Sequence, residues 1–187
     1  MKASIEKEYE WVRNAIAGDG IAFRKLVDHY KDYSLSIIRS ILKNPIKSED
    51  VLQDAFMKVY KNLDKFRFDA SFSTWLYRIM VNTSYNELKK NKKYTELNSE
   101  KIDKIPVEQN ELKLKDQQKF INRALDVLKP DEALVLRLHY LNEMKIREIE
   151  EITGFKSSKI KVDLHRGRTN FHHQLQKLLG KDINHLL

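Results

Sequence analysis

The sequence predicts an all-α protein of two helical domains joined by a charged linker. Apolar residues recur at spacings of three and four over most of the 187 residues, which is the periodicity of amphipathic helices. The chain holds only 5 Gly and 3 Pro, which leaves little material for the turns of β-hairpins. The periodicity fades between residues 94 and 115, where charged residues surround Pro106. We therefore expect domains at residues 1–93 and 116–187, with the linker at 94–115.

The charge of the chain favours a polyanionic partner. Its formal net charge is +8 and its pI is near 9.4, and lysine and arginine neutralise phosphates and release their condensed counterions. On charge alone, a solvated basic surface is an equal alternative. The chain has no Cys, which excludes disulfides and thiolate-ligated metals, and no apolar stretch of signal-peptide or membrane-spanning length. We expect a cytoplasmic protein without membrane insertion.

Three helices are expected before residue 64. Glu6–Ala17 has the pattern of a short helix that faces the core with Tyr9, Val12 and Ile16 and ends at the following glycines. A long amphipathic helix follows, and Asn44 and Pro45 break it. Its apolar face consists of Phe23, Leu26, Val27, Tyr30, Ile37, Ile38, Ile41 and Leu42.

The third helix, expected from Glu49 to Leu63 with Ser48 as its cap, has two distinct faces. Its buried face consists of Leu52, Phe56, Val59 and Leu63, and its polar stripe of Asp50, Gln53, Asp54 and Lys61. An acidic stripe on a basic protein cannot be aimed at phosphate. It either pairs with local lysines or docks on a basic protein surface, and spacing alone favours local pairing.

Residues 65–93 combine an aromatic and charged loop, a helix with a tryptophan, and a run of lysines at the end of that helix. Asp69 or Ser71 is expected to cap the helix. The core-facing stripe consists of Phe72, Leu76, Ile79 and Thr83, with Trp75 beside it. A second stripe consists of Thr74, Arg78, Asn82, Tyr85 and Lys89. Its donors, ring and positive charge suit single-stranded nucleic acid, which binds through stacking and phosphate attraction.

The second domain contains the pattern of a helix-turn-helix. Its opening helices are expected to bury Phe120, Ile121, Ala124, Leu125 and Leu128, then, after Pro130, Leu134, Val135, Leu138 and Leu141. From Glu143 to Phe171, isoleucines pack a first helix, Gly154 permits a left-handed turn, and a second helix follows. Such a unit places its second helix in the major groove of DNA. A plain three-helix protein-binding unit is the alternative.

Catalysis and metal binding find no support in the sequence. His165, His172 and His173 have no matching set of ligands at metal-site spacing, so the expectation is no metal and no cofactor. No nucleophile, base and orienting acid stand at a recognisable spacing, and no phosphate-cradling glycine loop is present. The chain is not expected to be an enzyme.

Three stretches, GDGIAFRKLVDHY, SEDVLQDAFMKVYKNLDKF and FSTWLYRIMVN, resemble region 2 of bacterial sigma factors, specifically the extracytoplasmic-function (ECF) group of the sigma-70 family. The helix-turn-helix resembles region 4 of the same proteins. The resemblance implies that Asp50, Gln53 and Asp54 contact the β′ clamp of core RNA polymerase, and that region 4 binds the minus-thirty-five element and the β flap. Small sigma factors of this group are commonly held inactive by an anti-sigma factor, and isolated ones tend to be compact with their domains closed on each other. The sequence leaves both properties open for this chain.

The resemblance further implies that the loop and the following helix capture a base flipped from the minus-ten element of promoter DNA. The base pocket would consist of Phe66, Arg67, Phe68, Asp69, Ser71, Tyr77 and Asn82, and the phosphate contacts of Lys89, Lys90, Lys92 and Lys93. A position in the core is an equal alternative for one of the two loop rings.

In region 4 the DNA contacts would be Ser157, Ser158, Lys159, Lys161, Val162, Arg166 and Arg168. In the same helix, Asp163 would repel phosphate if it faced DNA, and Gly167 is expected to interrupt the helix.

The sequence is thus identified as a sigma factor that joins core RNA polymerase, recognises promoter DNA at two elements and helps to open the duplex. Two alternatives stay open at this point. One is a helix-turn-helix regulator that never engages polymerase, and the other is a helical protein-interaction module without a DNA role.

Overall fold

The computed structural model describes residues 2–97 and 117–179, with side chains placed for residues 6–90 and 120–179. All regular structure in these ranges is helical, which confirms the predicted fold class. The N-terminal domain consists of α1 (Lys2–Ile16), α2 (Gly20–Leu42), α3 (Pro45–Lys61), the short 3₁₀ helix η1 (Leu63–Lys65) and α4 (Phe72–Leu97). The C-terminal domain consists of α5 (Gln117–Asp126), α6 (Pro130–Leu136), the π-helical turn η3 (Arg137–Leu141), α7 (Ile146–Thr153) and α8 (Ser157–Leu179).

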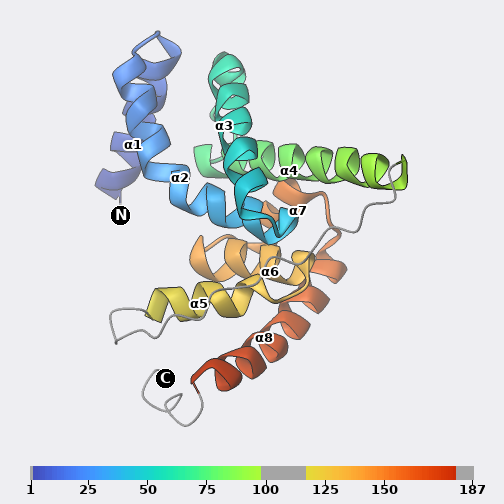
Figure 1. Cartoon of the computed structure of the whole chain (residues 1–187). Coiled ribbons are helices and arrows are strands. Elements are labelled where there is room, and N and C mark those ends of the chain that lie inside the picture. The colour runs from blue at the N-terminus through green and yellow to red at the C-terminus, as the bar shows by residue number, and fades with distance from the viewer. Residues whose placement is uncertain (1, 98–116, 180–187) are drawn as a thin grey trace.

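Helix α2 lies at the centre of the first domain, with α1, α3 and α4 packed around it (Figure 1). Asp19 caps its first turn, because the Asp19 carboxylate accepts hydrogen bonds from the backbone N–H groups of Ile21 (2.8 Å) and Ala22 (3.2 Å). The helix ends at Leu42, and the next residue, Lys43, adopts a left-handed conformation with φ 54°. The predicted apolar face is confirmed, because Leu26, Tyr30, Ile37, Ile38 and Ile41 are all buried.

Helix α3 begins four residues earlier than the sequence pattern indicates. Asn44 caps it by accepting a 3.1 Å hydrogen bond from the Lys47 N–H, and Pro45 occupies its first position. Ser48, expected as the cap, lies inside the first turn and donates its hydroxyl to the Asn44 carbonyl at 2.6 Å. The predicted break at Asn44 and Pro45 is therefore also the start of the next helix.

Helix α1 turns its final residue outward. Val12 is fully buried as predicted, but Ile16 is 38% exposed, and Ala15 fills the inward position of the last turn instead. The expected inward position of Ile16 is thus wrong, because the helix ends at this residue and the chain turns away through Gly18 at φ 96°.

The helix-turn-helix is formed by α7, a turn at Gly154 and α8. Gly154 has φ 72° and donates its N–H to the Glu150 carbonyl at 2.8 Å, which closes α7 with the predicted left-handed residue. Ile149, Ile152 and Ile160 are buried between the two helices and the rest of the domain. Helix α8 continues through Gly167 to Leu179, so the expected interruption at Gly167 is wrong.

The two domains pack against each other, with α7 against α4 and with α5, α6 and η3 against α2 (Figure 1). Hydrogen bonds between described residues cross the interface. Tyr77 donates to the Asn142 side chain at 2.9 Å, Tyr85 donates to Asp131 at 3.0 Å, and the Lys43 ammonium donates to the Asp126 carbonyl at 2.7 Å. The domains are therefore closed on each other, a point that the sequence had left open.

Within the described residues, no helix combines the length and the apolar character needed to cross a membrane.

Candidate nucleic-acid interface

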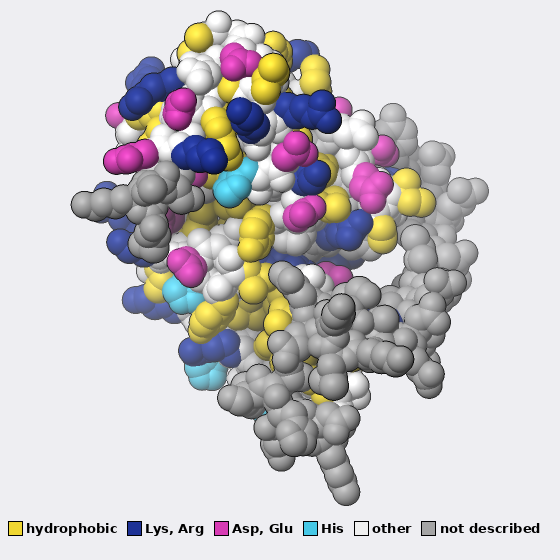
Figure 2. Space-filling view, turned by 90° about the vertical axis from the view of Figure 1, so that its left-hand side faces the viewer, with side chains coloured by type: hydrophobic (Ala, Val, Ile, Leu, Met, Phe, Trp, Pro, Cys, Tyr) yellow, Lys and Arg dark blue, Asp and Glu magenta, His cyan; other side chains and the backbone are white. Residues whose placement is uncertain are grey.

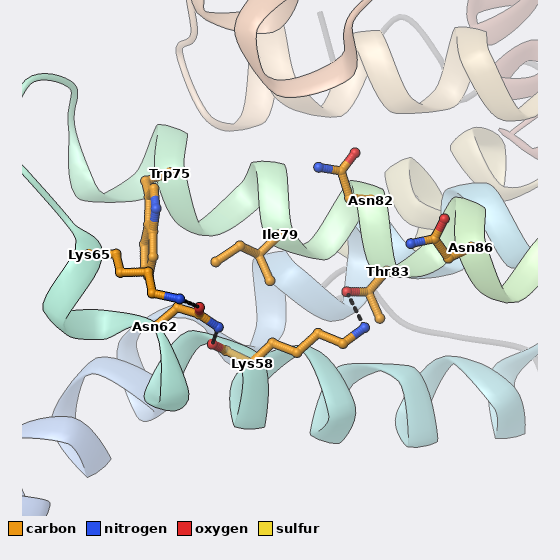
Figure 3. A pocket seen from close by; sticks show the side chains of 8 residues that line it. All are labelled: Lys58, Asn62, Lys65, Trp75, Ile79, Asn82, Thr83 and Asn86. Carbon is orange, nitrogen blue, oxygen red and sulfur yellow. Dashed lines mark hydrogen bonds between the residues drawn. The ribbon is translucent and has the colours of Figure 1, made fainter.

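A pocket of about 350 Å³ lies between α3 and α4 (Figure 3). The lining residues are Lys58, Asn62 and Lys65 from α3 and the turn after it, and Trp75, Ile79, Asn82, Thr83 and Asn86 from α4. The α4 residues share one helical face because they follow each other at spacings of three and four. The pocket thus forms where a polar edge of α3 faces a mixed aromatic and amide edge of α4.

The pocket has a flat apolar side and a polar side. The Trp75 ring is supported from behind by the rings of Phe66 and Phe72, with centroids at 5.5 and 5.8 Å. On the polar side, the Lys65 ammonium donates to the Asn62 side-chain oxygen at 2.8 Å, and Asn62 donates to the Lys58 carbonyl at 2.8 Å. The Lys58 ammonium lies 3.3 Å from the Thr83 hydroxyl. A planar heterocycle could stack on the ring side while amides and ammonium groups meet its edge and its phosphate.

Of the seven residues expected around a flipped base, only Asn82 lines this pocket. Arg67, Phe68 and Asp69 are exposed on the loop before α4, and Ser71 caps α4 by accepting a 3.2 Å hydrogen bond from the Thr74 N–H. The structure contradicts two of the seven positions. Phe66 is 5% exposed and belongs to the core, and Tyr77 is 3% exposed between α2 and the second domain.

Other expectations for α4 also change. Thr74, expected on the nucleic-acid stripe, is buried, whereas Trp75 and Ile79, expected in the core, are half-buried and line the pocket. Lys89 and Lys90 are exposed near the end of the described side chains, with Lys90 at 3.8 Å from Glu87. Lys92 and Lys93 belong to α4, but their side chains lie outside the described residues.

Seven of the eight pocket residues were not predicted as such. Trp75, Ile79 and Thr83 were expected in the core, and Lys58, Asn62, Lys65 and Asn86 were not singled out. A signal for three of them was present. Lys58, Asn62 and Lys65 are polar residues at spacings of four and three, so they form their own stripe at the end of α3. The missing information was that this stripe faces α4 rather than solvent.

The acidic stripe of α3 faces outward. Asp50, Gln53 and Asp54 are all exposed, and neither carboxylate forms an ion pair with any residue in the described ranges. Local pairing with lysines, which spacing alone favoured, is therefore not what this stripe does. Met57 and Tyr60 continue the exposed surface of α3 with 54% and 50% of their area accessible, which adds apolar area to the acidic stripe.

The residues of the helix-turn-helix that were expected to contact DNA differ in their exposure and in their interaction partners. Ser158, Lys161, Val162, Arg166 and Arg168 are exposed on α8, and Ser157 is half-buried at its first turn. Arg168 donates to the Tyr140 hydroxyl at 3.3 Å.

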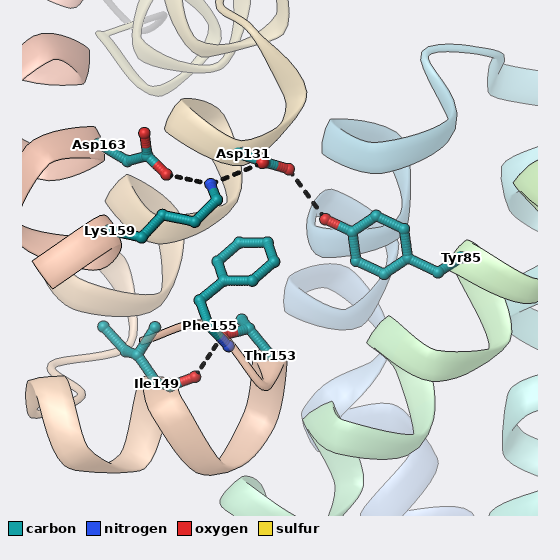
Figure 4. A network of polar contacts seen from close by, with 7 residues as sticks. All are labelled: Tyr85, Asp131, Ile149, Thr153, Phe155, Lys159 and Asp163. Carbon is teal, nitrogen blue, oxygen red and sulfur yellow. Dashed lines mark hydrogen bonds and ion pairs between the residues drawn. The ribbon is translucent and has the colours of Figure 1, made fainter. Parts of the chain in front are cut away.

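Lys159 is instead paired with two acidic residues of its own domain (Figure 4). Its ammonium donates to Asp131 at 2.7 Å and to Asp163, and lies 4.1 Å from the centroid of the Phe155 ring. The same Asp131 carboxylate accepts the Tyr85 hydroxyl from α4. Asp163 thus points its charge at a lysine of its own helix and does not repel DNA.

The pKa values of the two donors of this network, Tyr85 and Lys159, are both raised. Burial and the Asp131 carboxylate raise the pKa of Tyr85 above its ordinary value, so its hydroxyl remains a donor. Partial burial acts to lower the pKa of Lys159, but hydrogen bonds and charge from Asp131 and Asp163 outweigh it and raise that pKa. Both donors therefore keep their protons at neutral pH.

On the face of the molecule shown in Figure 2, Lys and Arg side chains are interspersed with Asp and Glu side chains. The net charge of +8 is therefore not gathered into one patch on that face. Across the described side chains, no three His, Asp or Glu residues are placed to hold a metal ion.

Comparisons with known proteins match both halves of the chain. The family model for sigma-70 region 2 matches residues 26–94, and the model for sigma-70 region 4 matches residues 121–171. The chain is 31% identical over 192 residues to the ECF RNA polymerase sigma factor SigW of Bacillus subtilis (strain 168), covering 95% of this chain and 100% of that one. It is 28% identical over 178 residues to the ECF RNA polymerase sigma-E factor of Escherichia coli (strain K12), covering 88% and 92%.

Two solved structures share the fold. One is CnrH in complex with the cytosolic domain of CnrY, with a TM-score of 0.62, 20% identity, and coverage of 91% of this chain and 98% of that one. The other is the sigma factor RpoE in complex with the anti-sigma factor NepR from Bartonella quintana, with a TM-score of 0.65, 22% identity, and coverage of 82% and 96%.

Proposed function

The chain belongs to the family of ECF RNA polymerase sigma factors, and we propose that two adjacent helices of its first domain divide the work of such a factor. As a sigma factor, the protein binds core RNA polymerase and directs promoter-specific initiation of transcription. In the proposal, the outer face of α3 docks on polymerase, and the pocket between α3 and α4 receives a base from the opened DNA.

The pocket is the observation that carries this proposal. Its volume of about 350 Å³ lies in the range of small-molecule sites, ~300–1,000 Å³. Extruding a base from a duplex costs a few kcal/mol, and stacking on an aromatic ring returns ~1–3 kcal/mol per base. Trp75 supplies the ring, and Asn82 supplies an amide that both donates and accepts at the base edge.

The exposed acids support the polymerase contact. Asp50 and Asp54 point their charge outward on a protein of net charge +8, so they are suited to a basic protein surface and not to DNA. The exposed Met57 and Tyr60 on the same helix add the apolar contact area that interfaces need. We assign this surface to the β′ clamp of core polymerase, and the second domain to the β flap and the minus-thirty-five element.

The closed arrangement has to open for both domains to reach DNA. Lys159, one of the expected major-groove contacts, is held by Asp131, which also binds Tyr85 of α4. In the proposal, docking of the two domains at separate places on polymerase breaks the hydrogen bond from Tyr85 to Asp131, while Lys159 stays paired with Asp131 and Asp163 inside the second domain. The chain also binds an anti-sigma factor in this proposal, which the complex of RpoE with NepR supports.

The match to sigma-70 region 2 does not favour the two alternatives left by the sequence, because neither a simple helix-turn-helix regulator nor a DNA-free interaction module accounts for it. We further propose that the protein acts in the cytoplasm beside its polymerase and has no active site of its own, since the polymerase performs the chemistry.

Transcription by purified core polymerase tests the proposal. With a library of random genomic fragments as templates, adding the protein is expected to produce transcripts with discrete start sites that share an upstream sequence. Transcripts whose start sites are the same with and without the protein would contradict the proposal.

A further inference from the structure

Phe68, in the loop before α4, adopts a backbone conformation that a bulky residue rarely takes. Its φ of 59° lies in the left-handed region, where side chains other than glycine are uncommon. Such a conformation persists only where the surrounding structure holds it, and it is concentrated at functional sites. The ring is nevertheless 41% exposed, so burial in the core is not what holds it.

Helix α1 supplies the contacts that hold Phe68. The Tyr9 ring lies 5.6 Å from the Phe68 ring, and the Arg13 guanidinium lies 5.9 Å from its centroid. Tyr9 and Arg13 stand four residues apart, so they lie on one face of α1 and reach the loop together. Helix α1 itself lies outside residues 26–94, the part of the chain that matches the sigma-70 region 2 model.

The same ring connects α1 to the pocket. Phe68 packs on Phe66 with centroids 4.7 Å apart, and Phe66 packs on Trp75 at 5.5 Å. Tyr9, Phe68, Phe66 and Trp75 thus form a continuous row of rings that ends at the apolar side of the pocket. Phe66 is buried between Phe68 and Trp75, so a displacement of Phe68 is passed on to Trp75, because close-packed interiors transmit strain.

We propose that α1 is a brace for the DNA-reading loop, with Tyr9 and Arg13 as its positioning residues. They hold Phe68 in its left-handed conformation, and through Phe66 they fix Trp75 where an unpaired base stacks. This proposal rests on the proposed function of the pocket. It makes α1 part of the machinery that selects the base, although α1 itself touches no DNA.

The test measures base preference, because a loss of stability alone reduces the amount of active protein without changing that preference. The probe is a set of DNA duplexes that contain an unpaired bubble, with one strand of the bubble randomised in sequence. The full chain, assembled with core polymerase, binds these duplexes, and sequencing of the bound DNA gives the base preference. The variants are Tyr9→Ala and Arg13→Ala, with Tyr9→Phe as the conservative change that keeps the ring.

Helix α1 offers matched controls. The Trp11 ring packs on His29 of α2 with centroids 6.1 Å apart, and the Lys7 ammonium lies 5.6 Å from the Trp11 ring. Trp11→Ala and Lys7→Ala therefore remove an aromatic and a cationic contact of α1 that do not involve the loop.

Tyr9→Ala is expected to reduce the strongest base preference ~2- to 10-fold, the equivalent of one aromatic pair, and Tyr9→Phe to retain it. Trp11→Ala and Lys7→Ala are expected to leave the preference unchanged. Equal effects of Tyr9→Ala and Trp11→Ala, or no effect of either, would overturn the brace.

Two further variants make the test decisive. Asn82→Ala alters the pocket directly and therefore separates the two proposals. If Asn82→Ala removes the base preference and Tyr9→Ala does not, the brace proposal is wrong and the pocket proposal stands. If neither variant changes the base preference, the pocket proposal is wrong. If Tyr9→Ala does not fold, Phe68→Gly replaces it, since glycine takes the left-handed conformation freely and removes the ring. An unchanged preference in Phe68→Gly would also overturn the brace.

Discussion

Gly167 allows α8 to pack closely against α6. It is buried in the middle of α8, and a Cβ atom there would lie 3.0 Å from Leu136 Cδ1 and 3.2 Å from Leu136 Cγ of α6. Glycine in a helix interior costs about 1 kcal/mol relative to alanine. The close approach of α8 to α6, which positions the recognition helix, offsets that cost.

Gly167→Ala is therefore expected to lower the free energy of unfolding by about 1 kcal/mol, because an overpacking cost of ~1–3 kcal/mol exceeds the gain in helix propensity. Urea unfolding measures it. Gly20→Ala, which meets no heavy atom within 4 Å, is the control and should be close to neutral. If the cost of Gly167→Ala is the same when Leu136 is also changed to Ala, the clash is not the cause.

Individual side chains in irregular segments were the least predictable from sequence. Phe66 and Phe68 stand two residues apart in a polar loop, yet one is buried and the other exposed. Periodicity does not apply there, and the outcome depends on the positive φ of Phe68 and on a distant helix, α1. Tyr77 was misplaced for a similar reason, since its partner Asn142 lies in the other domain.

At the scale of elements, α3 has three distinct faces, which point to the core, to the outside and to the pocket. Val51, Ala55 and Val59 face the core, the acidic stripe faces outward, and Lys58 turns toward the pocket. A helix repeats every 3.6 residues, so all three faces fit within its 17 residues. Substitutions can therefore alter one function of α3 without touching the others.

Reversing the charge of the acidic stripe tests its docking role. Asp50→Lys combined with Asp54→Lys is expected to weaken binding to core polymerase by about tenfold or more, since like charges then meet at the interface, while thermal unfolding changes little. Fluorescence anisotropy of the labelled protein titrated with core polymerase measures the affinity. Asp32→Lys, at an exposed position of α2, is the control. Unchanged affinity in the double variant would remove the docking assignment.

The exposed cations of α8 are expected to contact upstream promoter DNA. Lys161→Ala or Arg168→Ala should weaken DNA binding by the polymerase-bound protein, and loss of a phosphate contact should reduce the slope of log affinity against log salt by ~1. Lys177→Ala, exposed near the far end of the same helix, is the comparison. Equal losses in all three variants would indicate a general charge effect and not a defined contact face.

Helix existence was predictable, and helix edges were not. The apolar repeats predicted that α2 and the helices of the helix-turn-helix exist, because the buried faces of these helices follow the 3.6-residue period. The start of α3 was misplaced because Asn44 both ends one segment and caps the next. The pocket combines polar residues from two crossing helices, and no single-helix pattern reveals which polar stripe meets which.

At the scale of the whole molecule, the closed arrangement connects the two DNA-facing surfaces. The two carboxylate oxygens of Asp131, in the second domain, accept hydrogen bonds from different donors. One oxygen accepts from Tyr85 of α4 and the other from Lys159 of α8 (Figure 4). One carboxylate thus holds the recognition helix of one domain against the long helix of the other. Opening of the domains frees the Tyr85 hydroxyl, whereas Lys159 stays paired with Asp131 and Asp163 inside the second domain.

Asp131→Ala is expected to increase the open fraction of the free protein about tenfold, because it removes a hydrogen bond to a charged group, worth ~1.5 kcal/mol, across the interface. Energy transfer between dyes at Lys25→Cys and Lys177→Cys measures the distance between domains, and the absence of native Cys makes the labelling specific. Asp163→Ala removes a Lys159 contact inside the second domain only and should leave the distance unchanged. If both variants behave alike, Asp131 does not hold the domains together.

The most direct test compares fully paired templates with templates already opened at the minus-ten position. Transcription is measured for wild-type protein, the Asp50→Lys and Asp54→Lys double variant, and Asn82→Ala, each with core polymerase. The double variant should fail on both templates because it does not join polymerase, whereas Asn82→Ala should fail on paired templates and recover on opened ones. The same pattern for both variants would contradict a division of work between the outer face of α3 and the pocket behind it.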